Sequence, residues 1–191
     1  MTTADLLRAC ALYPGAREHV YLNVAAIGLV STRVRDAVAT VLEEHVALGN
    51  AAGPQWTEAS DRTRSRIAEL IGGRAANVAY TQNTSTGIAL VVNGIDWNQG
   101  DNVVVPADEF PSNFYPWLEL RRRGVQVREV PMIAGHADLS RMSELIDART
   151  RVVAISAVQY TSGHRYDSLR SEGSAARRCS WSMAPKPQGP W

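Results

Sequence analysis

The chain has 191 residues and a formal net charge of +1, and 45% of its residues are hydrophobic. This composition supports a folded core and provides no extended basic surface for nucleic acid or an anionic membrane. No apolar run approaches the ~18 residues of a membrane span. Residues 1–5 lack the basic and apolar parts of a signal peptide, so we expect a cytoplasmic protein.

Helical periodicity dominates the first part of the chain. Apolar residues recur at helical spacing over residues 34–46, with Ser31 or Thr32 as the N-cap and Gly49 just past the end. A second helix is predicted over residues 58–70.

After residue 75, short apolar runs alternate with helical stretches. The predicted strands are 77–80, 102–106, 125–130 and 151–156, and the predicted helices are 85–95, 112–123 and 138–147. This alternation is typical of strand–helix–strand units and predicts an α/β fold with a mostly parallel sheet. Because ligands of such sheets bind beyond the carboxyl ends of the strands, we expect the polar segments after the strands to form one site.

Composition suggests three segments. Residues 1–60 form an N-terminal helical segment, and residues 61–167 form the α/β domain. Residues 168–191 are aperiodic and rich in proline, which predicts a disordered tail. Cys10 and Cys179 are too few and too far apart for a disulfide framework, and no residues have the spacing of metal ligands.

A phosphate-binding turn is indicated between Thr81 and Gly87. Asn83, Thr84 and Ser85 stand where a strand gives way to a helix, and the glycine permits close backbone approach. The free N–H groups of a helix N-terminus, together with hydroxyls, can hold a phosphate without lysine or arginine. The same residues could instead simply cap the helix.

Three further segments could contribute to a site. In Glu109-Phe110-Pro-Ser-Asn113, Phe110 could stack on a flat cofactor or anchor the loop. Gln159 and Tyr160 follow the strand at 151–156, and Asn23 lies near the N-terminus in Tyr-Leu-Asn-Val-Ala-Ala-Ile-Gly.

In this order, the four segments resemble the class V aminotransferases, which are fold-type I pyridoxal-phosphate enzymes and include cysteine desulfurases and isopenicillin N epimerase. The resemblance implies the first part of a pyridoxal-phosphate-dependent transferase large domain. It also implies that Thr84 and Ser85 hold the cofactor phosphate, that Phe110 stacks on the ring, and that Gln159 or Tyr160 bonds its phenolic oxygen.

The resemblance further implies a small amino-acid substrate, contacted by Asn23, and a homodimer. Cysteine desulfurases have a histidine that takes part in proton transfer where this chain has Phe110. Because phenylalanine cannot carry a proton, the sequence favours an epimerase-like, lyase-like or transferase branch.

Two groups that this chemistry requires are missing: an acid beside the pyridinium nitrogen and a lysine that forms a Schiff base. In the family both follow the position of Asp167, where the resemblance in this chain ends. The sole lysine, Lys186, stands between two prolines, and we do not expect it to form the Schiff base with the cofactor. The chain is therefore expected to be a truncated and inactive fragment of a class V enzyme.

Two other interpretations stay open at this point. The chain could be a non-catalytic remnant that binds a partner through exposed apolar surface. It could also be an unrelated phosphate-binding or nucleotide-binding α/β domain, although it has neither a Gly-x-Gly-x-x-Gly fingerprint nor a Walker lysine.

A frameshift just after Asp167 would explain the missing groups. In a shifted frame, the codons from Arg178 to Pro187 permit Leu-Phe-Val-Val-Asp-Gly-Thr-Gln-Ala, which resembles the family's next strand and its acid. We predict that the gene's shifted frame continues into this strand and later into a lysine motif, which nucleotide sequencing checks. A shifted frame without either feature would refute the hypothesis.

Overall fold

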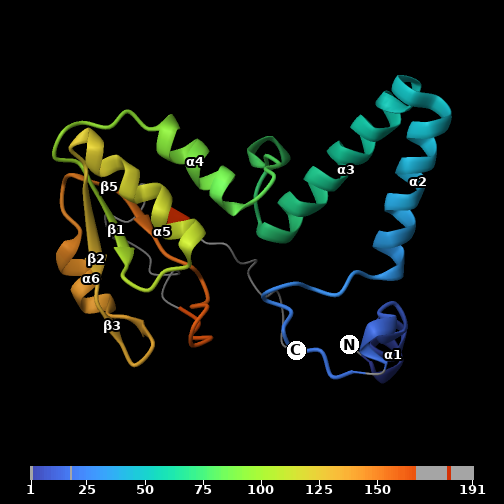
Figure 1. The fold of residues 1–191 in the computed structure, drawn as a ribbon, viewed down its shortest axis with the longest axis horizontal. Helices are drawn as coiled ribbons and strands as arrows, with labels where there is room; N and C mark the ends of the chain where they lie inside the picture. Colours follow the sequence, from blue (N-terminus) through green and yellow to red (C-terminus); the bar gives the residue numbers. More distant parts are fainter. Residues whose placement is uncertain (1, 18, 167–179, 182–191) are drawn as a thin grey trace. The chain divides into compact units, whose positions relative to one another are not determined.

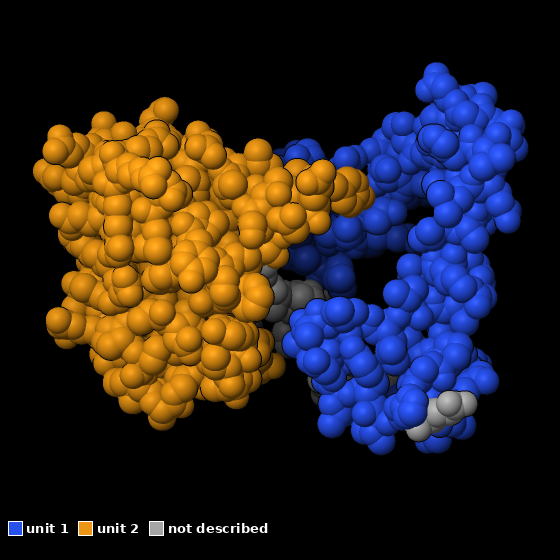
Figure 2. Space-filling model, viewed as in Figure 1, with its two compact units in different colours: residues 1–78, 187–191 blue, residues 79–186 orange. Residues whose placement is uncertain are grey.

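The structure, a computed structural model, describes residues 2–17, 19–166 and 180–181. Its described residues form two compact units, one ending at Val78 and the other beginning at Ala79 (Figure 2). In the described ranges, no helix combines the length and the apolar character needed to cross a membrane.

The division at Val78 and Ala79 does not test the segment boundary predicted near residue 60, which stays a prediction. Helix α3 (Gly53–Ile71) continues through that position without a break. It begins earlier than predicted, because Pro54 lies in the first turn, where an N–H group has no intrahelical partner to lose.

The first unit is helical. Its elements are α1 (Thr3–Ala11), η1 (Pro14–Ala16), α2 (Thr32–Leu48), η2 (Gly49–Ala52), α3 and η3 (Ala75–Asn77). Ser31 caps α2 by accepting a hydrogen bond from the Val34 N–H. Of the two residues predicted as the N-cap, Ser31 is therefore the one that serves. Trp56 of α3 donates its indole N–H to Glu44 of α2 at 2.7 Å, which joins these two helices.

The second unit is an α/β sheet with helices. Its elements are α4 (Thr84–Gly94), β1 (Asn102–Pro106), α5 (Pro111–Leu118), η4 (Glu119–Arg123), β2 (Gln126–Val130), β3 (Met132–Ile133), β4 (His136–Ala137), α6 (Leu139–Leu145), β5 (Thr150–Ala154) and β6 (Ser180–Trp181). The main sheet has the order β2-β1-β5-β6, and each of these pairings is parallel. The predicted α/β class is thus confirmed.

The predicted elements compare closely with the observed ones, with one exception. The strands predicted at 102–106, 125–130 and 151–156 correspond to β1, β2 and β5. The strand predicted at 77–80 is wrong, because the Val78 carbonyl accepts a hydrogen bond from Arg64 Nε at 3.1 Å instead of from a neighbouring strand.

The segment predicted as a disordered tail lies mostly outside the described residues, as do Asp167, Cys179 and Lys186. Within it the structure describes Ser180 and Trp181. These two residues form β6 and pair with β5, where composition alone predicts irregular chain.

Strand β1 lies at the centre of the second unit, and all five of its residues are buried. Because side chains alternate between the faces of a strand, Val103 and Val105 face one side and Val104 the other. The first side packs against Ile88, Val92, Trp117 and Leu120. The other side packs with Val130, Met142, Ile155 and Tyr166. Burial on both faces is the usual condition of a central parallel strand.

Helices α4 and α5 lie side by side and run in the same direction (Figure 1). Helix α5 follows β1 after a short loop, so its N-terminus lies at the carboxyl end of that strand. The parallel course of α4 directs its own N-terminus, at Thr84, toward the same edge of the sheet.

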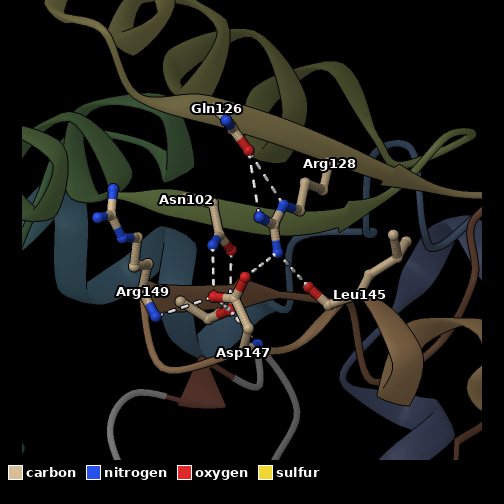
Figure 3. A network of polar contacts seen from close by, with 7 residues as sticks. Asn102, Gln126, Arg128, Leu145, Asp147 and Arg149 are labelled. Carbon is tan, nitrogen blue, oxygen red and sulfur yellow. Dashed lines mark hydrogen bonds and ion pairs between the residues drawn. The ribbon is translucent and has the colours of Figure 1, made fainter. Parts of the chain in front are cut away.

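A polar network joins β1, β2 and the loop before β5 (Figure 3). Asp147 accepts hydrogen bonds from Asn102 Nδ2 at 2.9 Å and from Arg128 Nη1 at 2.7 Å. Arg128 also donates to the Leu145 carbonyl, at the end of α6. The hydrogen bond from Arg128, followed by those from Asn102 and the Arg149 backbone, lowers the pKa of Asp147 from 3.8 to about 2.

We predict that Asp147→Asn lowers the melting temperature at neutral pH. Because the pKa of Asp147 is lower in the folded state than in the unfolded state, the carboxylate stabilises the fold above about pH 4 and loses this effect as the pH falls toward 2. The difference in melting temperature between wild type and variant should therefore narrow over that range. Asp96→Asn, at an exposed loop position, is the matched control, and a difference that stays constant down to pH 2 would count against the network.

Candidate functional site

The first turn of α4 provides the predicted phosphate-binding groups. Asn83 is the N-cap, and its side chain accepts the Thr86 N–H at 2.9 Å. The capping role that Thr84 and Ser85 could have had therefore belongs to Asn83. Thr84 and Ser85 occupy the first helical positions, where backbone N–H groups and the helix dipole favour an anion.

Gly87 lies next to Thr81, and its predicted close approach to a phosphate stays a prediction. A Cβ atom at this position would lie 3.4 Å from Thr81 Oγ1 and 3.8 Å from Thr81 Cγ2. Both distances are ordinary van der Waals contacts, so Thr81 alone does not require a glycine at this position.

Phe110 stands between β1 and α5, at the carboxyl edge of the sheet. Its side chain is 48% exposed, so it is not the buried loop anchor that the sequence left open. The ring contacts Tyr160 edge-to-face, with centroids 5.2 Å apart and an interplanar angle of 85°. One face of an exposed ring is a surface on which a flat ligand can stack.

Gln159 and Tyr160 follow β5 and differ in their surroundings. Gln159 is 2% exposed; its Nε2 donates to the Asp108 carbonyl at 2.7 Å and its Oε1 accepts the Tyr160 N–H at 2.8 Å. Tyr160 is exposed, and its hydroxyl donates to Asp108 Oδ1 at 3.4 Å. Desolvation, followed by the charge of Asp108, raises the pKa of the Tyr160 phenol. Of the two candidates, Tyr160 is therefore the exposed one, and Gln159 is buried.

The loops after β1 and β5 are joined by a buried carboxylate that the sequence did not single out. Glu109 is 6% exposed. Its Oε1 accepts the Phe110 N–H at 2.9 Å and the Ser156 hydroxyl at 2.5 Å, and its Oε2 accepts the Ser156 N–H at 2.8 Å. We name the segments at 107–110 and 155–161 the β1–β5 edge. The signal that could have identified Glu109 and Ser156 is their position directly after two strands of a parallel sheet.

The structure does not bring every predicted site residue to this edge. Phe110, Gln159 and Tyr160 are within the β1–β5 edge, and Thr84 and Ser85 begin the helix directed toward it. Asn23 belongs to the first unit, where its carbonyl accepts the Ala26 and Ile27 N–H groups, so its role as a substrate contact stays a prediction.

With this geometry, comparison with known proteins identifies the family. The profile described as Aminotransferase class-V matches residues 20–180, and the chain therefore belongs to that family. The match runs past Asp167, where the resemblance was expected to end. Family membership also removes support for an unrelated nucleotide-binding domain.

Curated relatives include cysteine desulfurases. The chain is 34% identical over 168 residues to a probable cysteine desulfurase of Methanothermobacter thermautotrophicus, covering 85% of this chain and 41% of that protein. It is 33% identical over 142 residues to a probable cysteine desulfurase of Pseudomonas aeruginosa, covering 72% of this chain and 35% of that protein. The chain thus spans less than half the length of these relatives.

Solved structures share the fold. A mutant of C-DES with glycine covalently linked to its PLP cofactor superposes with a TM-score of 0.75 at 22% identity, covering 82% of this chain and 43% of that one. The cysteine desulfurase CsdA of Escherichia coli superposes with a TM-score of 0.73 at 23% identity, covering 87% and 44%. The predicted partial large domain of a fold-type I enzyme is confirmed.

We predict that Gln159→Ala lowers the free energy of unfolding by about 2–4 kcal/mol, because it opens a cavity and leaves buried polar groups unpaired. Urea denaturation measures this value. The matched control is Gln99→Ala, at an exposed position, which should change it by less than about 0.5 kcal/mol. Equal stability of the two variants would show that the Gln159 amide does not hold the loops together.

Proposed function

We propose that the second unit carries the cofactor-binding part of a class V aminotransferase-like enzyme that acts on a small amino acid. The observation that carries the proposal is that the α4 N-terminus is directed toward the edge of the sheet at which Phe110 contacts Tyr160. Family membership and the PLP cofactor in the C-DES structure support pyridoxal phosphate as the ligand.

The residues present fit the chemical parts of pyridoxal phosphate. The first turn of α4, with Thr84 and Ser85, would bind the phosphate dianion. Phe110 would stack on the pyridine ring, and Tyr160, or the remaining N–H of Gln159, would bond the phenolic oxygen. When bound, the cofactor supplies an electron-withdrawing ring that stabilises negative charge next to an amino group.

The chain's own residues suggest binding without turnover. The described part of the chain contains no lysine, and Lys186 lies outside it. We therefore propose that the chain as written holds the cofactor non-covalently and does not complete the reaction. Because Phe110 cannot move a proton, we also propose an epimerase-like, lyase-like or transferase branch, although the relatives' names include cysteine desulfurases. The homodimer and the cytoplasmic location stay predictions.

Titration of the full chain with pyridoxal phosphate, followed by quenching of tryptophan fluorescence, tests this proposal. We expect saturable binding by the wild type. Phe110→Ala should weaken binding about three- to tenfold, because it removes the stacking surface. Tyr115→Ala, which removes another exposed aromatic residue from α5, should leave the affinity unchanged.

Two results would contradict the proposal. One is the absence of saturable binding, and the other is equal affinity of wild type and Phe110→Ala. The claim of non-covalent binding has its own test, since an absorbance band of a covalent adduct that disappears in Lys186→Ala would overturn it.

A further inference from the structure

Glu109 is a buried carboxyl group, and the described contacts of its side chain are with hydrogen-bond donors. Among the described residues, the ion pairs leave Glu109 out. Burying a carboxylate in this way is costly unless hydrogen bonds compensate, and Glu109 accepts three of them. Such an arrangement calls for an explanation beyond the stability of the sheet.

The donor set explains why this residue is an acid. The Phe110 N–H, the Ser156 N–H and the Ser156 hydroxyl all point at the side chain of Glu109. An ionised carboxylate accepts hydrogen bonds at both oxygens, whereas one end of a glutamine amide would direct N–H groups at a donor. The site therefore discriminates between two side chains of nearly the same size.

The two loops hold each other reciprocally. Glu109, after β1, reaches across to Ser156, and Gln159, after β5, reaches back to the carbonyl of Asp108. Asp108 adds a further link by accepting the Thr161 hydroxyl at 3.0 Å. The β1–β5 edge is thus fixed from both sides.

The same side chains hold the two aromatic residues. Glu109 accepts the N–H of Phe110, and Gln159 accepts the N–H of Tyr160. Phe110 has no side-chain cap to fix the start of α5, and its carbonyl accepts the Asn113 N–H. Both backbone groups of Phe110 are therefore bonded, which fixes the backbone position from which its ring contacts Tyr160.

We propose that Glu109 is a positioning residue of the site: its carboxylate fixes the Phe110 ring against Tyr160 and so presents the surface on which a phosphorylated pyridine ring stacks. This inference rests on the proposed function for its ligand. The geometry of the ring pair can also be measured without any ligand.

The direct test is Glu109→Gln in the full chain, compared with Glu129→Gln at an exposed site of β2 as the matched control. The chain has two phenylalanines, Phe110 and Phe114, so isotope-labelled phenylalanine gives signals that are readily assigned by NMR. We expect the nuclear Overhauser contact between Phe110 and Tyr160 to be lost in Glu109→Gln and retained in the control.

Ligand affinity is the second readout. Glu109→Gln should bind pyridoxal phosphate roughly tenfold more weakly, because the ring surface is no longer fixed and a buried donor is left unpaired. Inorganic phosphate, measured by competition, should keep its affinity, since it binds at the first turn of α4. A general loss of structure would instead weaken both ligands.

Each outcome decides the proposal. Retention of both the ring contact and the affinity in Glu109→Gln would overturn it. If that variant does not fold, Ser156→Ala is the alternative, because it removes only the hydrogen bond from the Ser156 hydroxyl to Glu109. Loss of the ring contact, with an affinity weaker by about two- to fivefold, would then support the proposal. If the wild type binds no pyridoxal phosphate, the proposed function fails, and the NMR contact still decides whether Glu109 positions the ring.

Discussion

The parallel pairing of β1 with β2 and β5 is the constraint on which the second unit depends. Since β1 is buried along its whole length, its backbone groups need partners on both sides, and the two neighbouring strands provide them. Parallel pairing also brings the carboxyl ends of β1 and β5 to one edge. The loops that carry Phe110 and Tyr160 become neighbours for this reason.

Polar side chains have different roles at the two ends of these strands. In the loop that leads into β5, Asp147 joins Asn102 and Arg128 through charged hydrogen bonds, which secures the register of the sheet. Beyond the carboxyl ends, Glu109 and Gln159 join loops instead of strands, and the aromatic residues that they hold are exposed. Polar groups therefore stabilise the fold on one side and orient ligand-binding surfaces on the other.

Much of the second unit could be predicted from the sequence, because apolar runs and helical periodicity reflect burial directly. Strands β1, β2 and β5 follow from such patterns, whereas β6 lies in a segment whose composition predicts irregular chain. The prediction of a strand at 77–80 was wrong. The Val78 carbonyl accepts a hydrogen bond from Arg64, and this contact between residues distant in sequence could not be predicted from the local pattern. The position of Glu109 directly after a strand was its only sequence signal, because its hydrogen bonds come from Ser156, which only the fold brings near.

The most direct test of the account is the mapping of backbone amide chemical shifts by NMR while pyridoxal phosphate is added. The account predicts that the amides of Thr84, Ser85, Phe110 and Tyr160 shift together and saturate at one ligand concentration. Shifts confined to the first unit, or shifts of the α4 amides without those of Phe110 and Tyr160, would contradict the claim that the α4 N-terminus and the β1–β5 edge form one cofactor site.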